Sequence, residues 1–487
     1  MNPLIPLLAG LALVAPASSP TTVTTDKGVV RGTVTASGTR SYQGIPYAAP
    51  PERWASPQPA ARWAGVRDAT RPGAACAQPA GLPVGVPSEA EDCLYLNVTA
   101  PAGNRRNLPV IVWIHGGSMM FGTGDMYGPD RLAADAVVVS MNYRLGVLSF
   151  LTHPALDSGS RFGSGSLALE DQQAALRWVR TNIGAFGGDP RNVTIMGQSG
   201  GGYAVCDHLA SPVSRGLFTR AIIQSAPCAT GGSRTRASAE ADSTGVISAV
   251  GCTDKPDIAA CLRAVPVADL LAAYDVWSEP RPVAGTALLP LSPADAFRTG
   301  RFNRVPVMIG VNHDEENGRY AAAPPIPADS YPATVGPEVL AHYPLSDYDN
   351  SASLALATIA TDRDWAVPTF DTALLLSRWT NTHMYEFAEH DTPWFAGYPA
   401  PDLPWRAQHM AELAYLFDLD LFAPRTPAQD RLAARLTTTW TNFAADASPG
   451  WHPFTPARPL VQSLASGRWT PTEFLDDHEY DLWSPHA

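Results

Sequence analysis

The pentapeptide Gly197-Gln198-Ser199-Gly200-Gly201 constrains the fold of this chain more than any other feature, because of the residues on either side of it. The β-branched run at 193–196 directly precedes it and predicts a buried strand, and the segment at 202–209 predicts a helix. A serine between the two lies on a turn so sharp that side chains two residues away on either side would collide, which explains Gly197 and Gly201. A loop that is merely rich in Gly and Ser is the alternative interpretation, and the flanking strand and helix disfavour it. We therefore expect the Ser199 hydroxyl to project from the carboxyl edge of a sheet, as a nucleophile would.

Short apolar runs alternate with helical patterns along the middle of the chain, as in a parallel sheet with crossover helices. The runs typical of strands buried on both faces lie at 110–114, 136–141, 221–223 and 305–309, and a last strand is expected near 384–387. The spacing of apolar residues predicts helices at 168–183 and 428–443. Together these patterns predict an α/β fold.

Three Pro-rich stretches interrupt this alternation, at 50–59, 322–332 and 392–404. None of them is long or polar enough to link independent domains, so we expect loops and insertions that decorate one sheet. The sequence thus predicts one large α/β domain over residues 18–487.

The charge balance excludes some classes of function. The chain has 34 Lys and Arg against 46 Asp and Glu, a formal net charge of −12. Nucleic-acid binding needs clustered Lys and Arg to neutralise phosphates, so no nucleic-acid partner is expected. Beyond the N-terminus no run approaches the roughly 18 apolar residues of a membrane span, so none is expected.

The first residues resemble a targeting segment. Residues 4–14 form an apolar run, and Ala15-Pro16-Ala17 has the small-x-small pattern that signal peptidases cleave. No Lys or Arg precedes the run, so a misassigned start or a buried N-terminal segment is the alternative. We expect a signal peptide at 1–17, a mature chain from about Ser18, and a secreted, bacterial protein.

Six cysteines fit an oxidising compartment. Cys76 with Cys93, and Cys252 with Cys261, could each close a short loop, which would stabilise the fold by up to ~3 kcal/mol. The remaining two, Cys206 and Cys228, form either a third bridge or buried thiols. Because no Cys-x-x-Cys or His-x-x-x-His spacing occurs, no metal site is expected.

A second motif supplies what a nucleophilic serine needs. His115-Gly116-Gly117-Ser118 follows the predicted strand at 110–114, and its glycines let the backbone N–H groups approach a reacting carbonyl oxygen. Such donors stabilise the developing oxyanion by about 3 kcal/mol each. We interpret His115 as a structural histidine that supports this loop.

Blocks of sequence from about residue 25 to 454 resemble the type-B carboxylesterase family, which includes cholinesterases and bacterial para-nitrobenzyl esterases. The resemblance is weakest between 318 and 355. Its blocks are the segments at 42–48, 91–98, 142–146, 182–190 and 302–307, together with the serine motif. The resemblance implies an α/β-hydrolase fold, with a mostly parallel central sheet flanked by helices and with large loop and helical insertions.

The resemblance also assigns site residues. The acid of the family falls on Glu315 and its base on His409, which gives a Ser199-Glu315-His409 triad in the α/β-hydrolase order. The oxyanion-hole positions fall on the N–H groups of Gly117, Ser118 and Gly200. Disulfides of secreted members match the pairs Cys76–Cys93 and Cys252–Cys261.

Other residues near these positions are the alternatives that the sequence leaves open. Asp314 or Glu316 could supply the carboxylate, and His313, His383 or His390 could supply the base.

Three positions depart from the usual family pattern. Gln198 stands where many members have Glu, which disfavours a cationic, choline-like alcohol. Gly200 replaces a common Ala, and Ala284 replaces an Asp that we interpret as structural. The apolar residues Met119, Met120 and Phe121 could line an acyl pocket, although such residues more often belong to the core.

The function that follows is a secreted carboxylesterase in which His409 activates Ser199, an acyl-enzyme forms, and water releases the acid. This chemistry requires no cofactor and no metal, and the partners are a small-molecule ester and water. The sequence does not fix the oligomeric state, and a monomer is the default expectation. The alternatives are an acyltransferase or a hydrolase of a specialised ester with the same triad, and a non-catalytic adhesion or binding protein.

Overall fold

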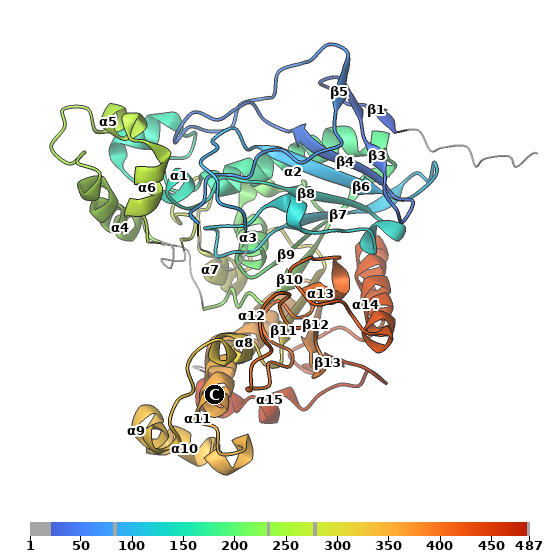
Figure 1. The fold of residues 1–487 in the computed structure, drawn as a ribbon, viewed down its shortest axis with the longest axis vertical. Helices are drawn as coiled ribbons and strands as arrows, with labels where there is room; N and C mark the ends of the chain where they lie inside the picture. Colours follow the sequence, from blue (N-terminus) through green and yellow to red (C-terminus); the bar gives the residue numbers. More distant parts are fainter. Residues whose placement is uncertain (1–20, 81–84, 231–233, 276–279, 485–487) are drawn as a thin grey trace, which may run out of the picture.

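A computed structural model describes residues 21–80, 85–230, 234–275 and 280–484. The expected signal peptide at 1–17 lies outside these residues. The described chain is organised around one large sheet with helices on both faces and two groups of inserted helices (Figure 1).

The described residues form a ten-stranded sheet in the order β13-β12-β11-β10-β9-β7-β8-β6-β4-β3 (Figure 1). From β8 through β13 neighbouring strands are parallel, whereas β6, β4 and β3 pair antiparallel at one edge. The strands are β3 (Thr33–Val34), β4 (Arg40–Pro46), β6 (Tyr95–Ala100), β7 (Leu108–Ile114), β8 (Val137–Met141), β9 (Gly188–Gln198), β10 (Arg220–Gln224), β11 (Val307–Asn312), β12 (Thr382–Phe387) and β13 (Val461–Leu464). A small separate sheet contains β1 (Thr22–Thr24), β2 (Val29–Arg31) and β5 (Val66–Asp68).

The central strands are buried on both faces, and the alternation of side chains along β7 demonstrates it. Val110, Val112 and Ile114 join one apolar core, whereas Ile111 and Trp113 join the core on the opposite face. The helices α2 (Leu167–Phe186) and α3 (Gly200–Ala210) contribute to the first core, and α13 (Leu413–Leu416) and α14 (Pro427–Asp446) contribute to the second. The continuous apolar runs in the sequence therefore result from burial of these strands on both faces of the sheet.

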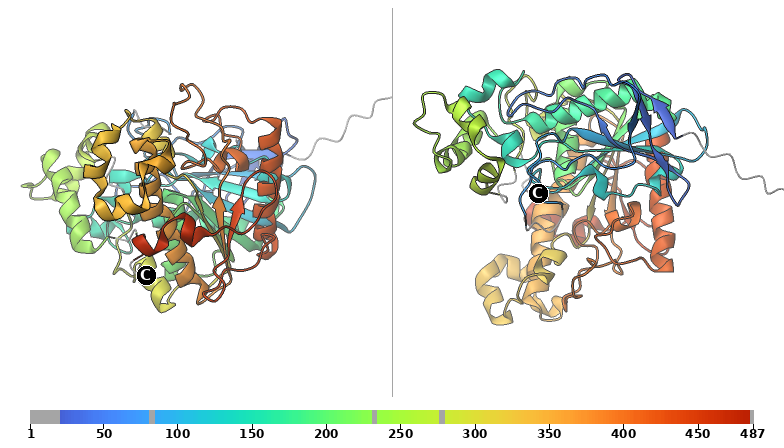
Figure 2. Two further views of the ribbon diagram at one scale, coloured as in Figure 1. Left: turned by 90° about the horizontal axis from the view of Figure 1, so that it is seen from below. Right: turned by 45° about the horizontal axis from the view of Figure 1, so that its top comes forward.

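Two groups of helices project away from the sheet (Figures 1 and 2). One group packs around its own small core and contains α4 (Arg236–Ala249), α5 (Ile258–Ala264) and α6 (Val267–Ala273). The other contains α8 (Asn317–Ala321), α9 (Tyr331–Val335), α10 (Pro337–His342) and α11 (Ala352–Thr361). The remaining α-helices are α1 (Gly146–Phe150), α7 (Pro293–Thr299), α12 (Val367–Ser377), α15 (Phe474–Asp477) and α16 (Tyr480–Trp483).

The predicted fold, a mostly parallel sheet flanked by helices with large insertions, is confirmed, with two local corrections. The strand near 384–387 is not the last, because β13 follows it and pairs with β12. The Pro-rich stretch at 322–332 is not wholly a loop, because it contains a 3₁₀ turn at Ala328–Ser330 and the start of α9. Proline is compatible with the first turn of a helix, where its missing N–H has no partner to lose.

Three disulfides join the described cysteines. The expected pairs Cys76–Cys93 and Cys252–Cys261 are both bridged. A third bridge, Cys206–Cys228, ties α3 to the segment after β10 and decides between the two possibilities that the sequence left open. Among the described helices, none combines the length and the apolar character that crossing a membrane requires.

Candidate active site

Ser199 occupies a sharp turn between β9 and α3. Its backbone dihedrals are φ 54° and ψ −124°, a conformation that costs a non-glycine residue energy and persists only where the surroundings enforce it. A Cβ atom on Gly197 would overlap the carbonyl oxygen of Gly201, and one on Gly201 would overlap the carbonyl oxygen of Ile114. Both glycines are therefore required by the closeness of the backbone, which is the physical reason inferred from the sequence.

The loop after β7 lies against this turn. Gly117, Ser118 and Met119 all have positive φ, at 98°, 52° and 60°. A Cβ atom on Gly200 would lie 2.9 Å from the backbone nitrogens of both Ser118 and Met119, so a glycine at 200 lets the loop approach the start of α3 closely. Within the described residues, the N–H groups of Gly117, Ser118 and Gly200 donate to no other group. The arrangement thus gathers three unused donors beside Ser199.

His115 supports the loop through contacts with Gly116 and Tyr143. Its ring is buried and stacks on Tyr143 with centroids 4.4 Å apart, and its Nδ1 lies 2.8 Å from the carbonyl oxygen of Gly116. Burial lowers the pKa of His115 to about 4, so the ring is neutral near pH 7 and donates through Nδ1. Tyr143 in turn donates its hydroxyl to the carbonyl oxygen of His115 at 2.7 Å. These contacts hold the loop, and no hydrogen bond joins His115 to Ser199 among the described residues.

His409 and Glu315 form a close pair. The Nδ1 atom of His409 lies 2.5 Å from Oε2 of Glu315, whose side chain is fully buried. The other carboxylate oxygen accepts the N–H of Asn312 at 2.9 Å, and the N–H of His409 donates to the carbonyl oxygen of Glu315 at 2.9 Å. Burial alone would lower the pKa of His409, but the charge and hydrogen bond of Glu315 outweigh it, so the pKa lies above its ordinary value. The pair therefore orients the imidazole and strengthens it as a base.

The second ring nitrogen of His409 reaches the serine turn. Its Nε2 lies 3.0 Å from Nε2 of Gln198, the residue directly before Ser199. Since Nδ1 carries the proton that Glu315 accepts, Nε2 has a free lone pair, and the Gln198 amide is the donor to it. The ring of Trp365 packs beside the imidazole with centroids 4.8 Å apart. Residues far apart in the sequence thus converge at the turn.

The alternative acids and bases lie in other surroundings. Asp314 is next to His313 at 3.3 Å and Arg406 at 3.7 Å, and Glu316 accepts the indole N–H of Trp365 at 2.9 Å. His383 is buried against Phe443 and Trp451, and His390 lies near His313 with ring centroids 6.3 Å apart. None of these side chains is hydrogen-bonded to His409 or Gln198 among the described residues.

Glu412 is a residue of this site that the sequence analysis missed. It is buried at the N-cap of α13, three residues after His409, and accepts the side-chain amide of Gln224 at 3.0 Å and that of Asn312 at 2.7 Å. Burial raises the pKa of Glu412 to about 7, and the charge of Glu315 adds to the rise. The only signal in the sequence was an acidic residue three positions beyond the predicted base, which many surface helices also have.

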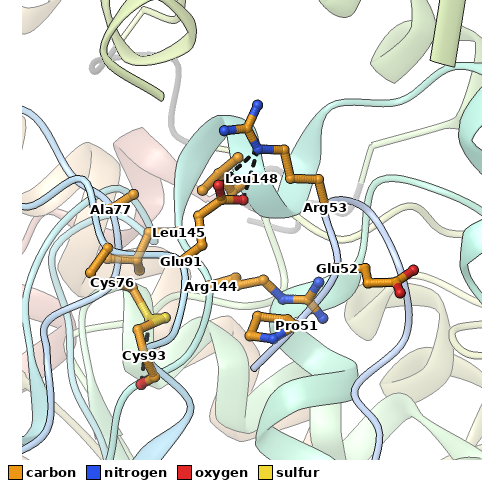
Figure 3. A pocket seen from close by; sticks show the side chains of 11 residues that line it. Pro51, Glu52, Arg53, Cys76, Ala77, Glu91, Cys93, Arg144, Leu145 and Leu148 are labelled. Carbon is orange, nitrogen blue, oxygen red and sulfur yellow. Dashed lines mark hydrogen bonds and ion pairs between the residues drawn. A yellow bond between two sulfur atoms is a disulfide. The ribbon is translucent and has the colours of Figure 1, made fainter. Parts of the chain in front are cut away.

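The apolar residues after the loop are core residues in this structure. Met119, Met120 and Phe121 are all buried, and the carbonyl oxygen of Met119 accepts the N–H of Gly146. A small cavity nearby is lined by the Cys76–Cys93 bridge and by the ion pair of Arg53 with Glu91, whose Nε and Oε2 are 2.8 Å apart (Figure 3). Ser199, Glu315 and His409 do not line that cavity.

Comparisons with known proteins point to one family of enzymes. The profile of the carboxylesterase family matches residues 19–483. A cocaine esterase of Oryctolagus cuniculus is 34% identical over 474 residues, which cover 87% of each chain. A para-nitrobenzyl esterase of Bacillus subtilis is 40% identical over 320 residues, 60% of this chain and 62% of that protein. A solved PNB esterase structure superimposes with a TM-score of 0.77 at 30% identity, covering 95% of this chain and all of the other.

Proposed function

The chain belongs to the carboxylesterase family and is a carboxylic-ester hydrolase, and from this premise we propose that it works through a Ser199-Glu315-His409 triad and an acyl-enzyme intermediate. The observation that supports the triad most directly is the His409–Glu315 pair, 2.5 Å apart, whose second ring nitrogen accepts the amide of Gln198, the residue next to Ser199. A serine hydroxyl needs such a base because its own pKa leaves it a poor nucleophile near neutral pH.

In the proposed reaction, Nε2 of His409 takes the proton of the Ser199 hydroxyl as the oxygen attacks the ester carbonyl. Glu315 holds the ring by its Nδ1 proton and stabilises the imidazolium that forms. The tetrahedral intermediate collapses, the C–O bond to the alcohol breaks, and His409 returns the proton to the departing oxygen. Water then attacks the acyl-enzyme by the same route and releases the acid.

The N–H groups of Gly117, Ser118 and Gly200 are the proposed oxyanion hole. They are free of other partners among the described residues. Gly117 and Ser118 belong to a loop fixed by the buried His115 and Tyr143, and Gly200 begins α3. Fixed donors stabilise the developing negative charge without reorganising, typically by about 3 kcal/mol for each donor.

The proposed substrates are small or medium uncharged esters. Gln198 brings a neutral amide to the place beside the base, so position 198 supplies no negative charge to attract a cationic alcohol. The name of one relative, para-nitrobenzyl esterase, fits this class of ester.

We also infer a secreted bacterial protein, with the mature single domain beginning near residue 18 and acting as a monomer. The three disulfides support the inference of secretion, because such bonds persist in oxidising compartments.

The triad is tested with Ser199→Ala and Glu315→Gln. Hydrolysis of para-nitrophenyl acetate should fall by about 10⁴-fold or more in Ser199→Ala, as for serine hydrolases deprived of their nucleophile. Glu315→Gln should also lose most activity, and both variants should keep the circular dichroism spectrum of the native chain. An organophosphate should modify the peptide containing Ser199 in the native chain. Full activity in Ser199→Ala, or modification of a different serine, would show the assignment to be wrong.

A further inference from the structure

His313, Glu386 and His478 converge from three separate parts of the chain, and we name them the His–Glu–His cluster. His313 follows β11, Glu386 lies in β12, and His478 follows α15. One potential ligand atom from each residue lies within 4.8 Å of the others. Glu386 and His478 are buried, whereas His313 is partly exposed and leaves a route to solvent.

We propose that this cluster binds one Zn²⁺ ion. Two imidazole nitrogens and a carboxylate oxygen form a donor set that favours Zn²⁺, because the hard cations Mg²⁺ and Ca²⁺ prefer oxygen ligands alone. Nε2 of His478 and Oε1 of Glu386 are now 2.6 Å apart. Ligands on a tetrahedral zinc ion lie roughly 3.3 Å apart, given bonds of about 2.0 Å, so this pair would separate by less than about 1 Å.

The contacts around His478 resemble those that hold a metal-binding histidine. Its Nδ1 lies 2.6 Å from Oδ1 of Asp362, which leaves Nε2 as the nitrogen directed at Glu386. The other oxygen of Asp362 accepts the hydroxyl of Tyr343 at 2.8 Å, and Trp483 donates its indole N–H to that hydroxyl at 2.6 Å. A carboxylate of this kind fixes the ring and makes the opposite nitrogen a stronger ligand.

His313 provides a second, independent observation. Its Nδ1 atom is buried, yet it forms no well-aligned hydrogen bond with the described residues, although Oδ2 of Asp314 is 3.3 Å away. Asp314 is thus a poorly aligned partner for this buried ring nitrogen, and a metal ion would satisfy the nitrogen better. The alternative to a metal site is an ion pair of His478 with Asp362 and Glu386. That ion pair alone would not provide a partner for Nδ1 of His313.

The position of the cluster indicates a structural ion. His313 lies two residues before Glu315, and His478 belongs to the last described segment of the chain. A zinc ion there would tie the C-terminal segment to the loop that carries Glu315. Local sequence spacing gives no hint of it, because the three residues are separated by more than 70 positions each.

The experiment is a titration of the full chain without a histidine tag. Protein treated with a chelator and dialysed into metal-free buffer is titrated with ZnCl₂ in a calorimeter, and its thermal unfolding is followed with and without zinc. We expect one Zn²⁺ bound per chain and a rise in Tm of several degrees, because an ion bound only by the folded state stabilises it. MgCl₂ should produce neither effect.

His313→Gln and a matched control locate the ion. His313→Gln should weaken zinc binding at least tenfold, and its partial exposure makes it the ligand variant that perturbs folding least. His390→Gln, at a histidine whose ring lies 6.3 Å from that of His313 and outside the cluster, should bind zinc like the native chain. Absence of zinc binding by the native chain, or equal affinity in His313→Gln, would overturn the proposal in favour of a plain buried ion pair. The same titration on Ser199→Ala needs no substrate, so its result does not depend on the proposed triad.

Discussion

His409 is surrounded by more negative charge than a simple triad supplies. Glu315 contacts its Nδ1 directly, and the buried Glu412 acts on it through space. Both carboxylates favour the protonated ring, and they oppose the burial that favours the neutral ring. A base with a raised pKa accepts the serine proton more readily, but it must first be neutral. The acid limb of the activity profile therefore reports on both carboxylates.

Glu412→Gln should shift that limb to lower pH. The raised pKa of Glu412, about 7, leaves this side chain partly ionised near neutral pH, and removing that charge lowers the pKa of His409. The measurement is kcat/KM for para-nitrophenyl acetate between pH 5 and pH 9. Glu389→Gln replaces another buried glutamate, which accepts the N–H groups of Asp391 and Ser466 and is not hydrogen-bonded to His409 among the described residues, and it should leave the profile in place. An unchanged acid limb in a correctly folded Glu412→Gln variant would mean that Glu412 only supports the packing.

Residues of this site differ in how far the sequence could predict them. Gly197 and Gly201 follow from the geometry of a sharp turn, without any relative, because only a backbone lacking Cβ fits there. Glu315 and His409 were assigned through family resemblance, since nothing local separates them from Asp314 or His390. Glu412 could not be predicted, because its role depends on the amides of Gln224 and Asn312, which come from two other strands.

At the scale of elements, the turn between β9 and α3 has no room for a side chain at Gly201, because the end of β7 lies against it. Gly201→Ala should therefore displace β7 or the turn, and we expect loss of at least about 100-fold in activity or failure to fold. Gly184→Ala is the matched control, because this exposed position in α2 has open space where the Cβ would lie. It should stabilise the chain by about 0.5–1 kcal/mol, as alanine does in a helix. Chemical denaturation with the esterase assay distinguishes the two, and a fully active Gly201→Ala enzyme would contradict the steric argument.

The central strands were predictable and the edge strands were not. Strands such as β7 are buried on both faces and appear in the sequence as continuous apolar runs. β13 has only four residues and one neighbour, so its segment at 461–464 carries too little of that pattern. The Cys206–Cys228 bridge was left open for a similar reason, because pairing depends on how α3 lies against the segment after β10.

At the scale of the whole molecule, the stability of the fold depends on carboxyl groups that are buried far from solvent. Asp207 in α3 is 3% exposed, and its Oδ2 atom has no hydrogen-bond partner among the described residues. Burial raises the pKa of Asp207 to about 8, and the nearby charge of Arg281 only partly opposes the rise. The folded chain therefore holds a proton here that the unfolded chain has already released at neutral pH.

The sign of the pH dependence follows from this difference. Below the ordinary pKa of Asp, near 4, Asp207 is protonated in both the folded and the unfolded chain, and its contribution to stability is complete. As the pH rises toward 8, only the unfolded chain releases the proton. The free energy of unfolding therefore falls by up to about 1.4 kcal/mol per pH unit. Asp207→Asn removes the titration while preserving shape, so the variant should become more stable than the native chain as the pH rises from 5 to 8. Asp295→Asn, at an exposed position in α7, should follow the native curve. The free energy of unfolding, measured in denaturant at several pH values, checks this expectation. Parallel curves for Asp207→Asn and the native chain would mean that Asp207 keeps an ordinary pKa in the folded state.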